Sequence, residues 1–122
     1  MNMFVLNAFK EACMPCVTKY GKELVFKQHD DIENAFQFYL GEFDGDSYFI
    51  NFEFDTVTIE EGNTFNKITI YLENSRSGKL SDDYVINLQY LIDIEKIEPI
   101  IDTLVKQLVE RPVEAGLNDF HF

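Results

Sequence analysis

The sequence has few of the features that mark several common protein classes. Its 122 residues include two cysteines, three prolines and no tryptophan, and no apolar run approaches the roughly 18 residues of a membrane-spanning helix. Two cysteines cannot form the disulfide framework of a small secreted protein, and the start of the chain shows no signal-peptide pattern. We therefore expect a cytoplasmic protein that does not associate with membranes.

Positive charge is also scarce, because 10 Lys and Arg stand against 22 Asp and Glu, for a net charge of -12. Phosphate backbones repel such a chain, which argues against direct nucleic-acid binding. The scarcity is uneven, since no Lys or Arg occurs between Lys27 and Lys67. The acidic residues of that segment supply -10 of the -12, and they are Asp30, Asp31, Glu33, Glu42, Asp44, Asp46, Glu53, Asp55, Glu60 and Glu61.

Apolar residues are abundant enough for a stable core. Hydrophobic residues make up 46% of the chain and aromatic residues 15%, from 12 Phe and 6 Tyr. This content excludes intrinsic disorder in spite of the net charge. A chain of this length fits one domain, so we expect a single α+β domain over residues 1–122.

Two helices are predicted from apolar residues at helical spacing. The clearer one spans about 94 to 110, and Pro112 prevents it from continuing. Its apolar stripe is Ile94, Ile97, Ile101, Leu104, Val105 and Leu108. A shorter helix is predicted from about 30 to 40, where Ile32, Ala35, Phe36 and Tyr39 share one stripe and Gly41 provides the stop.

Three strands are predicted between these helices and form an antiparallel meander. In the first, at 47–55, Tyr48, Ile50, Phe52 and Phe54 alternate with more polar residues, the pattern of a strand with one buried face. We expect a bulge near Asp55 and Thr56, which would turn Val57 and Ile59 inward. The returning strand contains Ile68, Ile70 and Leu72, a loop covers 74–82, and the third strand contains Tyr84, Ile86, Leu88 and Tyr90.

The first thirty residues allow two interpretations. Apolar residues from Phe9 to Tyr20 fit a helix, but Pro15 removes one of its hydrogen bonds and clashes with a carbonyl of the preceding turn. We favour two short helices that meet near Pro15; the alternative is a strand at 3–8 with a helix starting at the cysteines. Residues 24–26 are a candidate fourth strand, and 113–122 reads as a tail. The predicted fold is thus an antiparallel sheet of three to four strands packed against N-terminal helices and a long C-terminal helix.

The acidic segment is the main candidate for a binding site. Alternate residues of a strand point the same way, about 6 to 7 Å apart, so the polar residues of strand 47–55 should form a negative stripe. Phe49 lies on the same side and adds an aromatic residue of the kind found at interface centres. The candidate partner-binding residues are Glu42, Asp44, Asp46, Phe49, Asn51, Glu53, Asp55, Glu60 and Glu61.

Other motifs indicate alternative chemistry. Cys13-Met14-Pro15-Cys16 resembles the redox-active segment of thioredoxin-like oxidoreductases, in which a helix N-terminus stabilises a thiolate, although no proline follows Pro15 until Pro99 to supply that family's cis-proline. Residues 44–55 have the length of a calcium-binding EF-hand loop, but Phe49 replaces the required glycine and Asp55 the bidentate glutamate. We therefore expect no metal or other cofactor, and no catalytic residue is nominated.

An anionic stripe suits a basic protein partner, because complementary charge accelerates association and disfavours wrong surfaces. In size and acidity the chain resembles the immunity proteins that bacteria produce beside secreted nuclease-type toxins, as in contact-dependent inhibition. This resemblance implies a cytoplasmic inhibitor that neutralises a basic toxin domain. Mimicry of a nucleic acid toward a defence enzyme is a variant of this hypothesis. A third alternative is an acidic secretion chaperone resembling the type III class. The sequence leaves the oligomeric state open.

Overall fold

A computed structural model describes residues 3–29 and 32–110, without the side chains of residues 26–29, 32–34, 43 and 61. Its elements are, in chain order, α1 (Met3–Tyr20), β1 (Leu24–His29), β2 (Ile32–Phe43), β3 (Asp46–Thr58), the 3-10 helix η1 (Glu60–Gly62), β4 (Thr64–Asn74), β5 (Gly78–Lys79), β6 (Tyr84–Leu88), the 3-10 helix η2 (Leu91–Lys96) and α2 (Ile97–Val109). The predicted tail at 113–122 lies outside the described residues.

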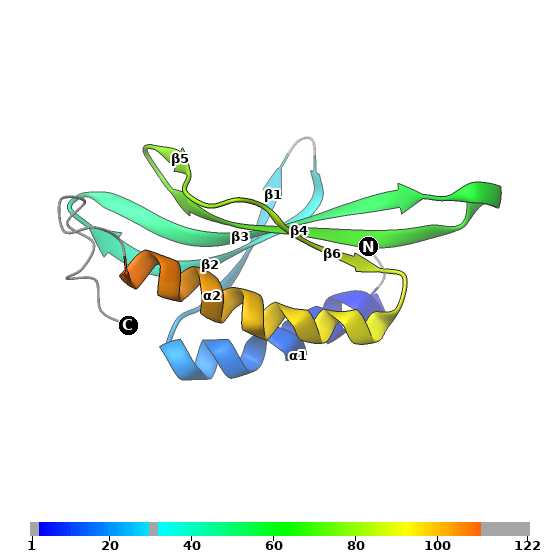
Figure 1. Cartoon of the computed structure of the whole chain (residues 1–122), viewed down its shortest axis with the longest axis horizontal. Helices are drawn as coiled ribbons and strands as arrows, with labels where there is room; N and C mark the ends of the chain where they lie inside the picture. The colour runs from blue at the N-terminus through cyan, green and yellow to red at the C-terminus, as the bar shows by residue number, and fades with distance from the viewer. Residues whose placement is uncertain (1–2, 30–31, 111–122) are drawn as a thin grey trace.

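The strands form one antiparallel sheet in the order β1-β2-β3-β4-β5, and β6 also pairs with β4. Both long helices lie on the same side of this sheet, and the described elements leave its other side uncovered (Figure 1). The predicted α+β class is confirmed. The sheet has more strands than the three to four expected, because β2 precedes the predicted meander and β5 lies in the loop predicted within it.

The predicted helix at 30–40 is wrong, because residues 32–40 belong to the strand β2, and residues 30 and 31 lie outside the described residues. Phe36, Phe38 and Leu40 alternate along it and are buried against the helices. β2 pairs with β1 on one side and with β3 on the other. The two neighbouring strands therefore stabilise an extended backbone in a segment whose apolar residues also fit a helix.

The predicted break at Pro15 is also wrong, because α1 runs from Met3 to Tyr20 with Pro15 inside it. The alternative strand at 3–8 is excluded by the same helix. Phe9, Cys13 and Cys16 are buried on one face of α1, whereas Pro15 is exposed. Burial of these three side chains stabilises the helix and offsets the one backbone hydrogen bond that Pro15 cannot donate. The candidate strand at 24–26 is confirmed within β1.

The central hairpin is confirmed as β3 and β4, but without the predicted bulge. The two strands pair in continuous register from Tyr48 opposite Asn74 to Thr58 opposite Thr64, so Val57 stays on the same side as Asp55. This end of the hairpin projects beyond the helices (Figure 1), and no core lies there to draw Val57 inward. At the start of β3, the turn Asp44-Gly45 has positive φ at both residues (52° and 84°), as a two-residue type I′ hairpin requires.

The two remaining predictions hold in part. The third strand is β6, which ends at Leu88 rather than at Tyr90, and the loop predicted before it contains the two-residue strand β5. The C-terminal helix begins as the 3-10 helix η2 and continues as α2 to Val109. Most of the predicted stripe is buried on α2, namely Ile97, Ile101, Leu104, Val105 and Leu108.

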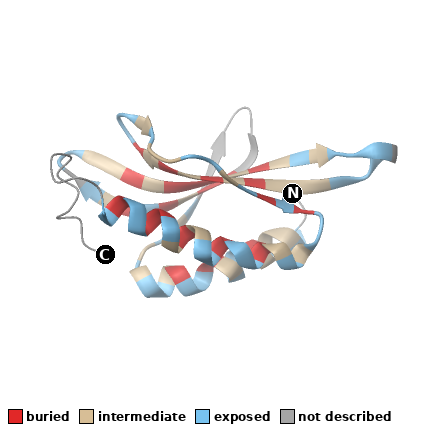
Figure 2. Cartoon of the chain, in the orientation of Figure 1, coloured by how far each residue is buried: buried red, intermediate tan, exposed pale blue. Residues whose placement is uncertain are grey.

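The core lies between the helices and one face of the sheet (Figure 2). Phe9 of α1 stands at its centre and contacts the rings of Phe36, Phe52 and Phe54, with centroids 4.9–5.2 Å apart. The contacts with Phe52 and Phe54 are edge-to-face, the geometry that aromatic quadrupoles prefer. One aromatic cluster thus fixes α1 to β2 and β3, and neither long helix covers the opposite face of the same strands.

Candidate functional site

The face of the sheet that points away from α1 and α2 is called the open face here. Residues opposite one another in an antiparallel pair point to the same face, so the strand registers define its members. Its described side chains are Val25, Ala35, Gln37, Tyr39, Glu42, Ser47, Phe49, Asn51, Glu53, Asp55, Val57, Phe65, Lys67, Thr69, Tyr71, Glu73, Lys79, Val85 and Asn87. The face combines aromatic rings, carboxylates and two ammonium groups.

Four of the nine predicted binding residues, Phe49, Asn51, Glu53 and Asp55, lie together in the middle of the open face, and Glu42, opposite Ser47, belongs to the same face at its end. They alternate along β3 as the sequence pattern predicts. Phe49, Glu53 and Asp55 are half-buried between neighbouring side chains, whereas Asn51 is only 4% exposed. These four side chains therefore lie on one face of β3 as predicted, but Asn51, in the middle of the stripe, is buried among its neighbours.

The other predicted residues lie at the two ends of the hairpins. Glu42 and Asp44 lie at the turn between β2 and β3, where Asp44 is exposed, and Asp46 follows that turn. Glu60 is exposed in η1, at the opposite end of β3, and the side chain of Glu61 is not described. The 13 residues of β3 span about 40 Å, so these acids do not form one cluster with the four central residues.

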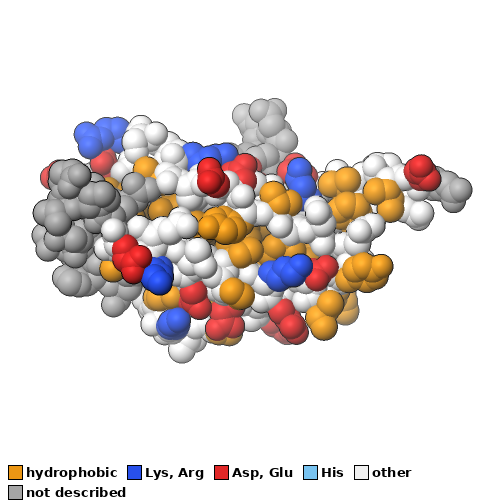
Figure 3. Space-filling view, in the orientation of Figure 1, with side chains coloured by type: hydrophobic (Ala, Val, Ile, Leu, Met, Phe, Trp, Pro, Cys, Tyr) orange, Lys and Arg blue, Asp and Glu red, His pale blue; other side chains and the backbone are white. Residues whose placement is uncertain are grey.

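Basic residues from later in the chain lie beside the acidic segment. Arg76 forms an ion pair with Asp46, with 2.9 Å between Nη2 and the carboxylate oxygen, and Lys67 stands directly opposite Asp55 in the register of β3 and β4. Figure 3 shows acidic and basic side chains interspersed on the side of the molecule in view. The segment that lacks bases along the sequence thus has bases as neighbours in space, and its field is weaker than the sequence alone indicates.

Hydrogen bonds hold the centre of the open face in one arrangement. Gln37 donates from Nε2 to Oδ1 of Asn51 (2.9 Å), and Asn51 donates from Nδ2 to the carboxylate of Glu73. The chain of contacts crosses from β2 through β3 to β4. Because a buried amide is costly without partners, this network fixes the orientation of the Glu73 carboxylate.

A second network surrounds Tyr71. Its hydroxyl donates to Glu53 (2.6 Å), and the ammonium of Lys79 lies 4.5 Å from the centre of its ring. Lys79 also donates to Asp83 at 2.8 Å. Burial and the neighbouring Glu53 raise the pKa of the Tyr71 hydroxyl, so it remains protonated as a donor. The hydrogen bond to Asp83 raises the pKa of Lys79, which keeps its positive charge.

An aromatic pair lies beside these networks. The rings of Tyr39 on β2 and Phe49 on β3 are 5.4 Å apart between centroids and tilted by 51°. Tyr39 is 37% exposed, and Glu73 stands directly opposite Phe49 on the next strand. Sequence reasoning missed Tyr39 because it assigned this residue to a helix. The alternation of Phe36, Phe38 and Leu40 was the signal that would have placed it on the open face.

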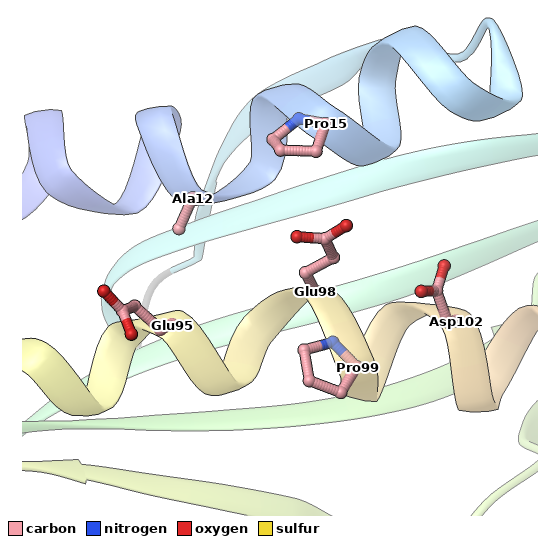
Figure 4. Close-up of a pocket in the computed structure, with 6 residues that line it drawn as sticks. All are labelled: Ala12, Pro15, Glu95, Glu98, Pro99 and Asp102. Carbon is pink, nitrogen blue, oxygen red and sulfur yellow. The ribbon is translucent and has the colours of Figure 1, made fainter.

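A second acidic surface lies between the two long helices and was not predicted. The groove has a volume of about 570 Å³ and is lined by Ala12, Pro15, Glu95, Glu98, Pro99 and Asp102. Figure 4 shows the carboxylates of Glu98 and Asp102 directed toward α1. The spacing of Glu95, Glu98 and Asp102, three and four residues apart, was readable as one helical face.

Asp102 is the most constrained acid of this groove. It accepts hydrogen bonds from the hydroxyl of Tyr20 and from Lys19, the latter at 3.2 Å. The hydrogen bond with Asp102 is the main cause that raises the pKa of Lys19, whereas burial is the main cause that raises the pKa of Tyr20. These contacts join the end of α1 to the middle of α2.

The two cysteines lie inside α1 rather than at a helix N-terminus. Both are buried and free. Burial raises the pKa of the Cys13 thiol, and burial together with the charges of Asp102 and Glu98 raises the pKa of Cys16 to about 11. A reactive redox cysteine requires the opposite shift, toward a stable thiolate. The arrangement fits two small apolar side chains in the core.

The described part of the chain contains no group of three or more His, Cys, Asp and Glu arranged to hold a metal ion. The residues of the rejected EF-hand spacing lie in an extended hairpin rather than in a loop. None of the described helices has the length and apolar character needed to cross a membrane. No protein-family model matches the chain, and no curated protein or solved structure matches it either.

Proposed function

We propose that this protein binds a cationic protein through the open face and acts by that binding, without catalysis of its own. The observation that carries the proposal is the open face itself: a broad sheet surface, free of described helices, on which an aromatic pair and carboxylates lie side by side. The solvated face of an antiparallel sheet is commonly polar, whereas exposed aromatic residues are enriched in interfaces.

The rigidity of this face supports the same proposal. Asn51 fixes Glu73, and Tyr71 fixes Glu53, so two carboxylates keep their positions before a partner arrives. Preorganised charges lose less entropy on association, and a net charge of -12 attracts a basic protein over a long range. The partner that fits best is the basic toxin domain of a bacterial competition system, of nuclease type, with this chain as its cytoplasmic immunity protein.

The alternatives are less well supported. The thioredoxin-like hypothesis requires a thiolate at a helix N-terminus, whereas Cys13 and Cys16 are buried within α1 with raised pKa values. The secretion-chaperone hypothesis requires a dimer, and sedimentation of the purified chain would identify one. Mimicry of a nucleic acid remains a variant of the main proposal, in which the basic partner is a defence enzyme.

The first test is the reading frame immediately upstream, which should encode a long secreted protein with a basic C-terminal domain; that domain is then the binding partner to be measured. Calorimetry at 50 and 300 mM NaCl should show tight binding that weakens with salt. Charge reversal by Glu53→Lys with Asp55→Lys should weaken binding by about 100-fold or more, within the range of coupling energies measured for close interfacial charge pairs. Circular dichroism and the urea midpoint check that the variant remains folded.

The matched control reverses two exposed acids of the other acidic surface, Glu95→Lys with Glu98→Lys. Its overall charge equals that of the first variant, but its binding should change less than about threefold, an effect of overall charge alone. Equal losses in the two variants would contradict the open face as the binding surface. Absence of any binding at 50 mM NaCl would contradict the toxin domain as the partner.

A further inference from the structure

One row of side chains crosses the open face perpendicular to the strands. Tyr39 is opposite Phe49, Phe49 is opposite Glu73, and Glu73 is opposite Lys79. At the other end, the backbone carbonyl of Glu23 accepts the amide of Tyr39 at 3.2 Å, which extends the row to the start of β1. Because adjacent strands are about 4.8 Å apart, the Glu73 carboxylate lies within reach of a group bound over the two rings.

We infer that the Tyr39–Phe49 pair and Glu73 form a platform for an arginine side chain of the partner; the inference rests on the proposed function. A guanidinium is planar, stacks on aromatic rings and can, while stacked, donate in its plane to the Glu73 oxygen that Asn51 leaves free. An ammonium has no plane to stack on the rings. The platform therefore prefers arginine to lysine.

The same face already shows how it binds a cation. Lys79 lies over the ring of Tyr71 while a carboxylate, that of Asp83, accepts its hydrogen bond. This is a cation held between an aromatic face and an anion. Over the rings of Tyr39 and Phe49, by contrast, lies no lysine or arginine among the side chains that the structure describes.

Glu73 is held ready for this role. Asn51 donates to one of its two oxygens and is itself held by Gln37. No other side-chain hydrogen bond to Glu73 occurs among the described residues, so its second oxygen is available to a guanidinium. The buried amide thus acts as a positioning residue for the carboxylate.

Two capped tetrapeptides of equal charge serve as probes, one of four arginines and one of four lysines, each N-acetylated and C-amidated. Titration of the ¹⁵N-labelled full chain followed by NMR should give tighter binding of the tetra-arginine peptide by about three- to fivefold, the contribution of an exposed cation–π contact. The largest shifts should occur at Tyr39, Phe49 and Glu73. Tyr39→Leu with Phe49→Leu should bring the affinity ratio of the two peptides to about one.

Two further variants test the role of the Glu73 charge and provide a matched control. Glu73→Gln retains the acceptor for Asn51 but loses the charge, and it should reduce binding of the tetra-arginine peptide even if the double leucine variant fails to fold. Val85→Leu, an exposed residue elsewhere on the open face, is the matched control and should leave the ratio unchanged.

The outcomes separate this inference from the proposed function. Equal affinity of the two peptides, with shifts elsewhere on the open face, would overturn the arginine platform and leave the cation-binding face intact. Shifts centred on Glu95, Glu98 and Asp102 would place cation binding between the helices and contradict both. Absence of binding by either peptide at 50 mM NaCl would also contradict both.

Discussion

The two faces of this sheet are built from the same strands and differ in nearly every physical respect. Toward the helices, β3 presents Tyr48, Ile50, Phe52 and Phe54, all buried and apolar. Toward the open side it presents Phe49, Asn51, Glu53 and Asp55, which are joined to their neighbours by ring contacts, hydrogen bonds and opposite charges. The comparison teaches that the hydrophobic core lies on one face, so that packing constrains the residues of the other face less.

The largest expected effect comes from two phenylalanines of the same strand. Phe52→Ala, which removes a fully buried ring in contact with Phe9, should lower the free energy of unfolding by about 3–5 kcal/mol. Phe49→Ala on the open face should lower it by only about 1 kcal/mol, since the ring is half-buried. Urea denaturation measures both. Similar losses at the two positions would show that the open face also carries the core.

The next effect concerns the thiols beneath the helix-covered face. Because burial raises the pKa of Cys16 from about 9 to about 11, and that of Cys13 in the same direction, unfolding releases protons above pH 9. The contribution of the two protonated thiols to the free energy of unfolding is complete below pH 9 and is lost as the pH rises toward 11. The urea midpoint should therefore fall between pH 8 and pH 10.5.

A variant separates the cysteines from other groups that titrate there. The pKa values of Tyr20 and Tyr71 are also raised and give a dependence of the same sign. Cys13→Ala with Cys16→Ala should lower the midpoint at every pH but flatten its decline. An unchanged slope would assign the alkaline loss to the tyrosines together with Lys19 and Lys79, whose pKa values are also raised.

A smaller effect is expected from the buried amide of the open face. Asn51→Ala removes both hydrogen bonds of a 4% exposed side chain and should cost about 1–3 kcal/mol. Thr69→Ala, in the neighbouring row, is the control and should change stability by less than about 0.5 kcal/mol. If Asn51→Ala were as mild as the control, Glu73 would not depend on this amide for its position.

The smallest effect is expected at the surface ion pair between Arg76 and Asp46. Arg76 is largely exposed, so Arg76→Ala should change the free energy of unfolding by less than about 1 kcal/mol. It should strengthen binding of the tetra-lysine probe, because it removes a base from an acidic hairpin end. Weaker binding by this variant would show that Asp46 needs its partner in order to contribute.

The strong periodic signals of the sequence were sufficient for much of the fold. Strict alternation from Tyr48 to Phe54 defined β3 and its two faces, and the apolar stripe from Ile97 to Leu108 defined α2. Residues 32–43 could not be assigned this way, because Phe36 fits both a helical stripe and a strand. Pairing with β1 and β3, which a local pattern does not contain, decides between them.

The sequence predicted which side chains of β3 share a face, but it did not predict the basic residues that lie beside them. Parity along β3 places Glu53 and Asp55 on one face whatever lies next to them. The bases come from later elements, since Lys67 of β4 lies opposite Asp55 and Lys79 of β5 lies opposite Glu73, and their placement depends on registers between strands. Tyr39 was not predicted as a residue of the open face, because the sequence pattern predicted a helix where β2 lies.

The outer margin of β4 has a consequence for self-association. β6 pairs with Asn66 to Ile70, β5 pairs with Glu73 and Asn74, and between them the amide of Leu72 donates to Oγ of Ser81. The 11-residue edge of β4 is thereby covered by β5 and β6, which have two and five residues. Such short edge strands offer few free backbone groups to a strand of a neighbouring molecule. Edge-to-edge addition of a second sheet is therefore disfavoured along this side.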